Sequence, residues 1–523
     1  MPLSVASVRS FRPRPYHAAA ALFFIVVGAV FYVPYLNDLP TGIHTWAQSD
    51  RLSLAINFYD YGFHFFTPRT SSLVSIGGIT GVEFPLQAYL AALGGLVFGR
   101  GSIITLFRLL DVAMLLLGFY YLFRLVFERT GHFVAGLVPG AFLLASPFFA
   151  FYAGGFMPDS FSLSLSFIAY YYWLRFFETR HFPDLRVAVL VLGLAALIKT
   201  TTALHFGALA GITLIWAFLE PTRLTLRERL EFIGLGGGVV ALIAYFFFHN
   251  QHLNELYQSG QFLAEARPIA NPETLHDVLK YVRLNWLQEY ATITQYRTLG
   301  VCAGLLLLYI RPNLRQYLPL TLLLLAAVVL GYLFVQLMGV QFSTHDYYAI
   351  CVALPPAVLL LVLGLLNLGQ YTGKIRYGTS AGLAVLIFFL VANGYKRLNQ
   401  RMSDDYPPFS PFAHIWMRGG ATELAKAGVP EAATILVFNE GAPNIPLVYF
   451  DRRGFAWQPE SVPVITAEDL LSRMAVDSLD YLIMAPNVYA QLAPQHPAIA
   501  AEFETVAQQP AMVFRRRNLS RPW

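Results

Sequence analysis

Residues 18–36 read AAAALFFIVVGAVFYVPYL, and the polar stretch His44-Thr-Trp-Ala-Gln-Ser-Asp50 follows soon after. About 20 consecutive apolar residues are needed to cross a membrane, so the first stretch predicts a transmembrane helix. It could also be the core of a signal peptide, but no small-residue cleavage site follows it. We therefore interpret it as an uncleaved helix whose N-terminus, with Arg9, Arg12 and Arg14, lies in the cytoplasm. The polar stretch is then expected on the opposite side, at the membrane–water boundary.

The composition predicts a polytopic membrane protein. Of the 523 residues, 56% are hydrophobic and 13% are charged, and the mean hydropathy is +0.53. Soluble domains usually carry about 25% charged residues. The two cysteines, Cys302 and Cys351, lie in apolar segments, which favours unpaired thiols over a disulfide or a metal pair. Membrane lipids are the expected surroundings, and nucleic acid is not an expected partner.

The basic residues predict about eleven spanning helices, because that number places the short arginine-rich loops, such as those at Arg124, Arg223 and Arg311, in the cytoplasm. Residues 84–98 are apolar but short, and we interpret them as an interfacial helix. If they span, the count rises to about 12 or 13. The expected spans are residues 18–36, 103–123, 133–152, 161–177, 187–198, 202–219, 232–248, a segment ending at Arg311, 318–338, 347–368 and 379–395.

The chain is expected to divide into a transmembrane domain, residues 1–399, and a small soluble periplasmic α/β domain, residues 400–523. Within the first, residues 37–100 form a periplasmic loop with interfacial helices. In the second, Thr466-Ala-Glu-Asp469 resembles a capping box that opens a helix. We interpret this domain as a lid or partner-binding module rather than a second active site. Its expected strands are residues 434–438, 446–450, 480–484 and 512–515.

Several ionisable residues are expected at the outer ends of the helices, although charge near the hydrocarbon region is costly, at roughly 2.5–3.5 kcal/mol each. They are distant in sequence, yet the predicted topology brings all of them to one depth on one side. This coincidence predicts a shared site. Its candidates are Asp50, Glu83, Asp159, Lys199 and the run His345-Asp346-Tyr347-Tyr348.

Each candidate also has a structural explanation. Asp50 or Asp159 could begin a helix, a role that suits the pair Pro158-Asp159. Lys199 could extend towards lipid headgroups. His345, Tyr347 and Tyr348 could belong to an interfacial aromatic belt, and Arg51 and Arg69 could face solvent or headgroups.

The chemistry of this set suits a phosphate-bearing lipid. A carboxylate can act as a general base towards a hydroxyl or amine, or can bind a divalent cation. Lysine, arginine and histidine stabilise phosphate oxygens. A phosphate leaves readily once its charge is matched, so a base and a cation are sufficient for transfer from a lipid phosphate.

These features resemble the GT-C membrane glycosyltransferases, in particular the family 39 branch that holds protein mannosyltransferases and the lipid A aminoarabinose transferase. The resemblance covers roughly residues 15–400. It rests on the acidic residue of His44-Thr-Trp-Ala-Gln-Ser-Asp50 after the first helix and on the pair Pro158-Asp159. Lys199, after the fifth helix, and His345-Asp346-Tyr347-Tyr348, before a late helix, complete it.

The resemblance implies a GT-C fold and inverting transfer of a hexose or pentose from a polyprenyl-phosphate donor. The transfer is expected at the periplasmic side of a bacterial inner membrane, to a lipid, glycan or protein acceptor. It implies that Asp50 is the catalytic acidic residue, that Asp159 is the second acidic position and that Lys199 lies near the donor phosphate. No cofactor is predicted with certainty: a divalent metal at Asp50 and Asp159 stays open, and no ligand-spaced motif supports it.

One departure from the family concerns donor binding. Many relatives read Trp-Arg-Gln where this chain has Trp46-Ala47-Gln48. Arg51 or Arg69 is then the candidate replacement for the missing arginine. The full expected donor-binding set is His44, Arg51, Arg69, Glu83, Lys199, His345, Tyr347 and Tyr348.

Two other function classes remain open from the sequence. A transporter or flippase of a lipid-linked sugar would show internal repeats and helices broken near the midplane, and we find no convincing repeat. A scaffold that presents the C-terminal domain would leave the charged first loop unexplained. A glycosyltransferase accounts for more of the sequence than either alternative.

Overall fold

The computed structural model describes residues 14–220, 224–262, 266–404 and 413–517. Its contacts divide the chain into two units. We call the first, Met1–Leu36 with Arg108–Phe248 and Ala264–Met402, the helical unit. The second, Asn37–Phe107 with His249–Leu263 and Ser403–Trp523, is the mixed unit. Arg9, Arg12 and Arg223, which helped to orient the predicted helices, lie outside the described residues.

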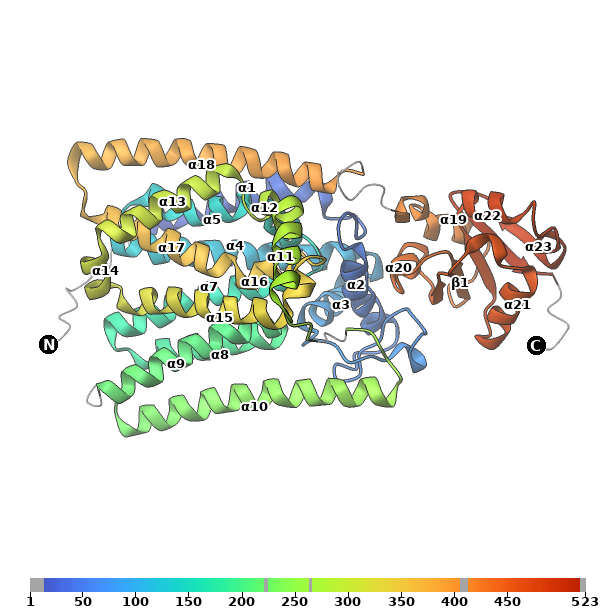
Figure 1. The fold of residues 1–523 in the computed structure, drawn as a ribbon, viewed down its shortest axis with the longest axis horizontal. Coiled ribbons are helices and arrows are strands. Elements are labelled where there is room, and N and C mark those ends of the chain that lie inside the picture. The colour runs from blue at the N-terminus through green and yellow to red at the C-terminus, as the bar shows by residue number, and fades with distance from the viewer. Residues whose placement is uncertain (1–13, 221–223, 263–265, 405–412, 518–523) are drawn as a thin grey trace. The chain divides into compact units, whose positions relative to one another are not determined.

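The helical unit is built from long apolar helices, of which α10, α15 and α18 can be followed end to end in Figure 1. In the described part of the chain, six helices are long and apolar enough to cross a membrane, or up to eight if each of two bent pairs is one span. The helices that lie wholly or mostly in this unit are α1 (Arg14–Tyr32), α4 (Ile103–Thr130), α5 (Phe133–Ala145), α6 (Pro147–Ala153), α7 (Pro158–Thr179), α8 (Phe182–Ile198), α9 (Ala203–Leu219), α10 (Leu226–Leu256), α11 (Pro272–Tyr281), α12 (Leu287–Tyr290), α13 (Ile293–Leu308), α14 (Ile310–Gln316), α15 (Leu318–Phe342), α16 (Tyr348–Val352), α17 (Leu354–Leu366) and α18 (Gly373–Met402).

Each predicted span coincides with a helix, and two of them are broken. The third is divided into α5 and α6, which meet at 89°. Pro147 follows the break, and the residue before a proline is disfavoured in the α conformation. The tenth is divided into α16 and α17 at Ala353, just before Leu354-Pro355-Pro356. The criterion of length and apolarity selects fewer spans than eleven partly because α8 has only 17 residues.

Buried small and hydroxylated residues let α7 pack closely against its neighbours. Ser162 donates a hydrogen bond to the Ala195 carbonyl of α8 at 2.8 Å and lies 2.7 Å from the Thr202 hydroxyl. The indole of Trp173 is fully buried and donates to Thr213 of α9 at 2.8 Å. These contacts fix the end of α7 that carries Asp159 relative to the end of α8 that precedes Lys199.

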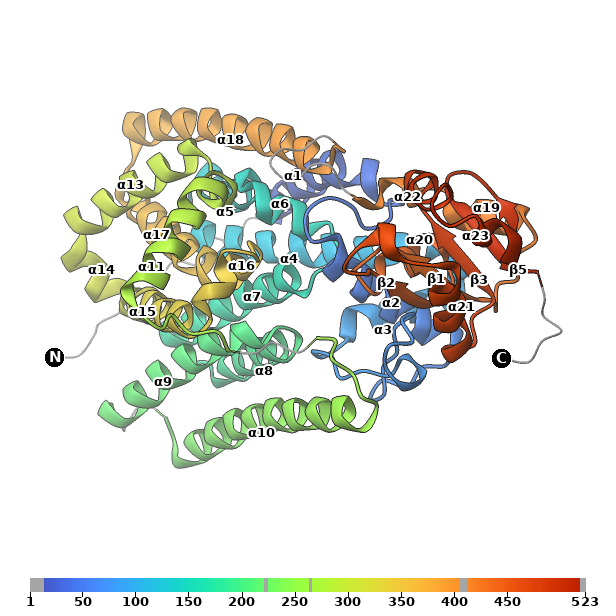
Figure 2. The ribbon, with the colours of Figure 1, turned by 45° about the vertical axis from the view of Figure 1, so that its right-hand side comes forward.

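The mixed unit joins the first loop to the C-terminal residues (Figure 2). Its first-loop helices are α2 (Thr45–Asp60) and α3 (Leu86–Phe98), and α3 is the predicted short apolar helix. The C-terminal part contains the helices α19 (Gly420–Lys426), α20 (Ile445–Phe450), α21 (Ala467–Val476), α22 (Pro486–Leu492) and α23 (Ala498–Glu502), and the strands β1 (Thr434–Phe438), β2 (Arg453–Trp457), β3 (Tyr481–Met484), β4 (Phe503–Ala507) and β5 (Met512–Arg516).

The five strands form one mixed sheet in the order β2-β1-β3-β5-β4. β1 pairs in parallel with β2 and β3, whereas β5 is antiparallel to β3 and β4. The predicted strands at β1, β3 and β5 are confirmed, and so is the Thr466 capping box of α21. The predicted strand at 446–450 is wrong, because this run forms α20, with Pro446 in its first turn. A short, fully buried apolar run has no periodicity that separates strand from helix.

Backbone hydrogen bonds join the first loop to the sheet at Gly454. Leu73 N–H donates to the Gly454 carbonyl at 2.8 Å, and Gly454 N–H donates to the Ser71 carbonyl at 3.2 Å. A Cβ at Gly454 would meet the Ile435 carbonyl oxygen at 1.9 Å, and φ here is 153°. Only glycine permits this approach. The loop that follows α2 is therefore fixed to β2, close in sequence to α20.

Candidate active site

Asp50 lies inside α2, nearly three turns before the helix ends, and the residue is 9% exposed. The helix begins after His44, whose backbone is left-handed at φ 55° and whose ring lies 6.3 Å from that of Trp46. Left-handed backbone is uncommon outside glycine. The Thr45 hydroxyl donates to the Gly42 carbonyl at 2.6 Å and fixes this turn. The left-handed turn at His44 therefore begins α2, and Asp50 lies on the buried face of this helix.

Asn444, at the start of α20, holds the Asp50 carboxylate. Its Nδ2 donates to Asp50 Oδ1 at 2.8 Å. Its Oδ1 accepts from the Ser72 backbone N–H at 3.0 Å and from the Ser53 hydroxyl at 3.3 Å. Asn444 is fully buried. The amide is therefore locked in one orientation, with its donor towards Asp50.

The electrostatic setting of Asp50 suits the role of general base that the sequence predicts. Burial raises the pKa of its carboxyl group from 3.8 to about 6, while the Asn444 hydrogen bond and the charge of Arg51 lower it and only partly compensate. A base works best when its pKa lies near the working pH. A buried carboxylate with a pKa of about 6 is still largely deprotonated at neutral pH.

The other first-loop candidates lie in the same unit. Arg51 Nη2 and Glu83 Oε2 form an ion pair at 2.6 Å, and the Arg51 guanidinium lies 4.8 Å from the Phe262 ring centroid. Arg69 is half-buried and its backbone bridges to Ile79, but it makes no ion pair with any residue that the structure describes. Arg51 and Arg69 were the two expected replacements for the missing family arginine. Of these, Arg51 already forms an ion pair with Glu83.

A second group of candidates lies in the helical unit. Asp159 follows Pro158 in the first turn of α7, and its side chain is fully buried. Met157, not Asp159, is the N-cap residue. Lys199 ends α8, and its Nζ lies 3.5 Å from Asp159 Oδ1. The two predicted charges form a buried ion pair at the N-terminus of α7, where the helix dipole also stabilises the carboxylate.

Two tyrosines face the Lys199 ammonium. Its Nζ lies 5.7 Å from the Tyr347 ring centroid and 5.9 Å from that of Tyr348. His345 stacks on Tyr348 with the ring centroids 5.4 Å apart, and its Nδ1 lies 2.7 Å from the Thr344 hydroxyl. The structure therefore brings Asp159, Lys199 and the His345–Tyr348 run together, as the sequence predicted.

A buried charge network holds this run in place. Asp346 accepts from the Tyr152 hydroxyl at 2.7 Å and from Arg401 Nη2 at 2.7 Å. Arg401 Nη1 in turn lies 3.2 Å from Glu289 Oε2, which belongs to α12. Arg401 and Glu289 were not predicted. Arg401 could have been suspected, because it is a charged residue at the end of α18, the last predicted span. Asn444 was also missed, since nothing local marks it and its partner lies 394 residues away.

The predicted residues thus form two groups. His44, Asp50, Arg51, Arg69 and Glu83 belong to the mixed unit, whereas Asp159, Lys199, His345, Tyr347 and Tyr348 belong to the helical unit. Within the described ranges, no group of three or more His, Cys, Asp or Glu side chains is placed to hold a metal ion. The first group can accept a proton, and the second carries a cation that can meet an anion.

Comparisons with known proteins identify one family and two solved structures that the chain resembles. Residues 83–248 match the family model described as dolichyl-phosphate-mannose-protein mannosyltransferase. The structure of ArnT from Cupriavidus metallidurans bound to undecaprenyl phosphate is similar at a TM-score of 0.60 and 14% identity, over 94% of this chain and 97% of that one. The structure of the same ArnT in the apo state is similar at a TM-score of 0.59 and 14% identity, over 95% of this chain and 98% of that one. No curated protein sequence matches the chain.

The family match covers the segment from the start of α3 to α10, and the structural likeness extends over nearly the whole chain. At 14% identity the likeness establishes the fold: a helical GT-C membrane fold with a small C-terminal sheet domain. The family match over residues 83–248 and this likeness both support membership of the GT-C superfamily of membrane glycosyltransferases.

Proposed function

We propose that this protein transfers a sugar from a polyprenyl-phosphate donor to an acceptor at the periplasmic side of a bacterial inner membrane, with inversion at the anomeric carbon. The observation that carries the proposal is Asp50, a buried carboxylate oriented by Asn444 and with a pKa of about 6. The donor class is supported by the family description, which names a dolichyl-phosphate sugar, and by the ArnT structure solved with undecaprenyl phosphate.

In the proposed reaction, Asp50 takes a proton from the acceptor hydroxyl or amine. Asn444 holds Oδ1, so Oδ2 is the oxygen that receives this proton. The acceptor oxygen or nitrogen forms a bond to the anomeric carbon as the bond from that carbon to the phosphate oxygen breaks. Both electrons of the broken bond leave with the polyprenyl phosphate, and inversion follows from attack on the opposite face.

Lys199 is the proposed counter-charge for the departing phosphate. An ammonium has three donors, so it can keep its Asp159 contact while it binds a phosphate oxygen. The tyrosine rings around it lower the cost of holding a cation away from water. We assign His345, Tyr347 and Tyr348 to the same phosphate region, and Asp159 to the positioning of Lys199.

The test uses the full-length purified protein in nanodiscs with radiolabelled undecaprenyl-phosphate-linked mannose or aminoarabinose. Lipid A and a periplasmic protein extract serve as acceptors, and both label transfer and release of undecaprenyl phosphate are measured. Asp50→Asn is expected to lower turnover by at least about a hundredfold, the lower range for general-base catalysis. Asp60→Asn, on the same helix but exposed and paired with Arg100, is the matched control. Turnover of Asp50→Asn near that of the control would remove the proposed base.

The proposed topology places the N-terminus in the cytoplasm and the sheet domain in the periplasm. Cys302 and Cys351 are both buried, so a cysteine introduced at the surface can be labelled selectively. Lys426→Cys on α19 replaces a side chain that is 67% exposed. A membrane-impermeant maleimide applied to intact spheroplasts is expected to label it. Labelling only after lysis would place the domain in the cytoplasm and overturn the proposed side of transfer.

A further inference from the structure

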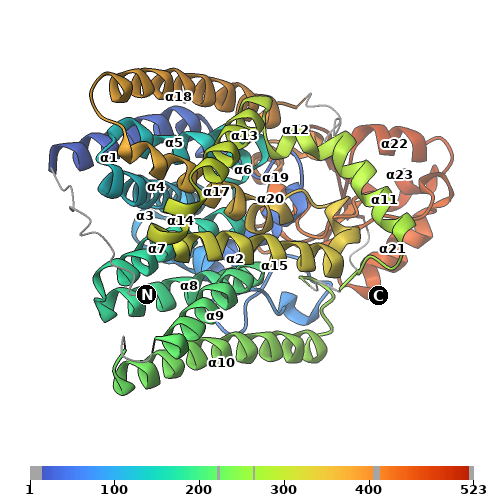
Figure 3. The ribbon, with the colours of Figure 1, turned by 60° about the vertical axis from the view of Figure 1, so that its left-hand side comes forward.

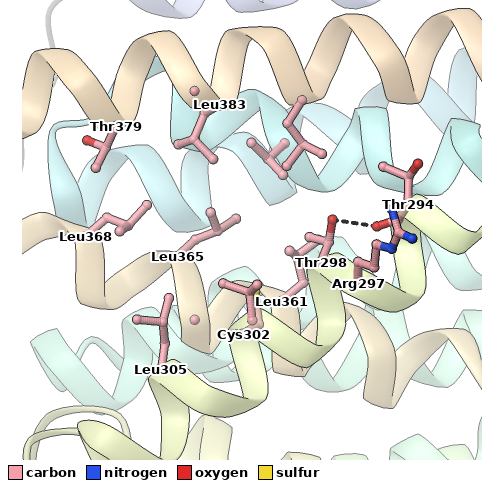
Figure 4. Close-up of a pocket in the computed structure, with 15 residues that line it drawn as sticks. Thr294, Arg297, Thr298, Cys302, Leu305, Leu361, Leu365, Leu368, Thr379 and Leu383 are labelled. Carbon is pink, nitrogen blue, oxygen red and sulfur yellow. Dashed lines mark hydrogen bonds between the residues drawn. The ribbon is translucent and has the colours of Figure 1, made fainter.

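An apolar groove lies among four helices of the helical unit, away from Asp159 and Lys199 in sequence (Figure 4). Its volume is about 450 Å³, within the usual range of ligand sites. Its walls are residues 294–305 of α13, residues 361–368 of α17 and the turn after it, residues 379–386 of α18, and Val138 of α5. The helices α13, α17 and α18 can also be followed as neighbours in Figure 3.

The groove has the length of one membrane leaflet. At 1.5 Å per residue, the α13 wall extends about 16 Å, and half of the hydrocarbon thickness of a bilayer is about 15 Å. Gly364 holds α17 against α13, because a Cβ there would meet Cys302 Sγ at 2.8 Å. Gly382 on α18, by contrast, makes no close helix contact, since a Cβ there would meet no atom within 4 Å. The groove is therefore narrow at its base and open along α18.

Charge is confined to one end of the groove. Arg297 is the one charged residue among those that line it, and it is exposed. It forms no ion pair with any residue in the described ranges. The nearby Thr298 hydroxyl is bonded to the Thr294 carbonyl at 2.8 Å, as Figure 4 shows. An uncompensated arginine at a hydrocarbon surface is costly, and the guanidinium fork matches a phosphate.

We propose that this groove binds one anionic glycerophospholipid, with an acyl chain along α13 and its phosphate on Arg297. The groove is as long as the acyl region of one leaflet, whereas the much longer undecaprenyl chain exceeds it. The complementary charge of Arg297 selects a phosphate headgroup over an uncharged lipid. The site is separate from the proposed donor site, and it makes a specific membrane lipid part of the folded helical unit.

Native mass spectrometry of the full-length protein, reconstituted with phosphatidylglycerol and released from mild detergent, tests the proposal. The unmodified protein is expected to retain one phosphatidylglycerol. Arg297→Gln is expected to weaken retention by at least about tenfold, the loss of one charge-assisted contact. Gly382→Leu is expected to do the same by filling the groove, since the added side chain enters open space.

Matched controls make the test specific. Arg283→Gln removes an exposed arginine outside the groove, and Gly378→Leu adds the same side chain about one turn away on α18, also in open space. Both are expected to retain the lipid. Equal retention by Gly382→Leu and Gly378→Leu would overturn the site. Diacylglycerol retained as strongly as phosphatidylglycerol would overturn the role of Arg297, and displacement by equimolar undecaprenyl phosphate would overturn the assigned lipid class.

Discussion

Replacing Asp50 with asparagine is predicted to stop sugar transfer and at the same time to stabilise the folded protein. Burial raises the pKa of Asp50 from 3.8 to about 6. One pKa unit corresponds to 1.36 kcal/mol, so the charged carboxylate makes folding less favourable by roughly 3 kcal/mol. Asparagine keeps an oxygen that can accept the Asn444 hydrogen bond, and it carries no charge.

The pH dependence follows from the sign of this shift. Well below pH 4 the carboxyl group is protonated in the folded and the unfolded chain, and the substitution has no electrostatic effect. From there to about pH 6 the unfolded chain loses its proton more readily than the folded one, and the unmodified protein loses stability. Well above pH 6 the full loss of folding stability, roughly 3 kcal/mol, is present. The stabilisation by Asp50→Asn is therefore expected in full at pH 8 and only in small part near pH 4.

Thermal unfolding in detergent, followed by intrinsic fluorescence at several pH values, measures this effect. A difference of about 3 kcal/mol is expected to raise Tm by several degrees at pH 8. Asp60→Asn is the control, because it removes an exposed ion pair with Arg100 and is expected not to stabilise. An Asp50→Asn protein that melts no higher than the unmodified protein at pH 8, or higher by the same amount at both pH values, would refute the reasoning.

Three further predictions concern neighbouring contacts. Asn444→Ala removes a hydrogen bond that lowers the Asp50 pKa, so the acid limb of the pH–rate profile should move above about pH 6; an unmoved limb would argue against Asp50 as the titrating base. Arg401→Leu leaves Asp346 buried without its cation and is expected to cost about 3–5 kcal/mol; adding Asp346→Leu should restore part of the lost thermal stability, and no restoration would contradict the pairing. Thr466→Ala removes the α21 capping box and should cost about 1 kcal/mol in thermal unfolding, whereas an unchanged transition would show that the cap contributes nothing.

The spanning helices were predictable because their signal is strong and local. Each predicted span coincides with a helix, and so does the apolar run of α3, which is too short to span. The break between α5 and α6 was readable in principle from Ser146-Pro147, since a proline restricts the residue before it. The 89° angle between α5 and α6 could not be predicted from the sequence, because packing against other helices sets it. The failure at α20 has a different cause, as six buried apolar residues satisfy a strand and a helix equally well.

The candidate site was predictable to the extent that charges in an apolar chain are conspicuous. Lys199, Asp159 and the His345–Tyr348 run were selected on that ground, and they contact one another in the helical unit. Asn444 carries no charge and lies in a polar segment, so it has no such signal. Its importance depends on a contact with Asp50 that only the folded mixed unit creates.

The hydrogen bond between Asn444 and Asp50 also sets an order for biogenesis. Asn444 is synthesised 394 residues after Asp50, and at 5–20 residues per second the ribosome needs roughly 20–80 s to make that interval. Throughout it, α2 is complete while the carboxylate has no amide donor. A ribosome that stalls between α18 and α20 leaves every helix of the helical unit synthesised and the proposed base without its amide donor. If Asp50 is the base, as proposed, catalytic competence is thereby tied to synthesis of the C-terminal residues, which begins only once α18, the last helix of the helical unit, has been made.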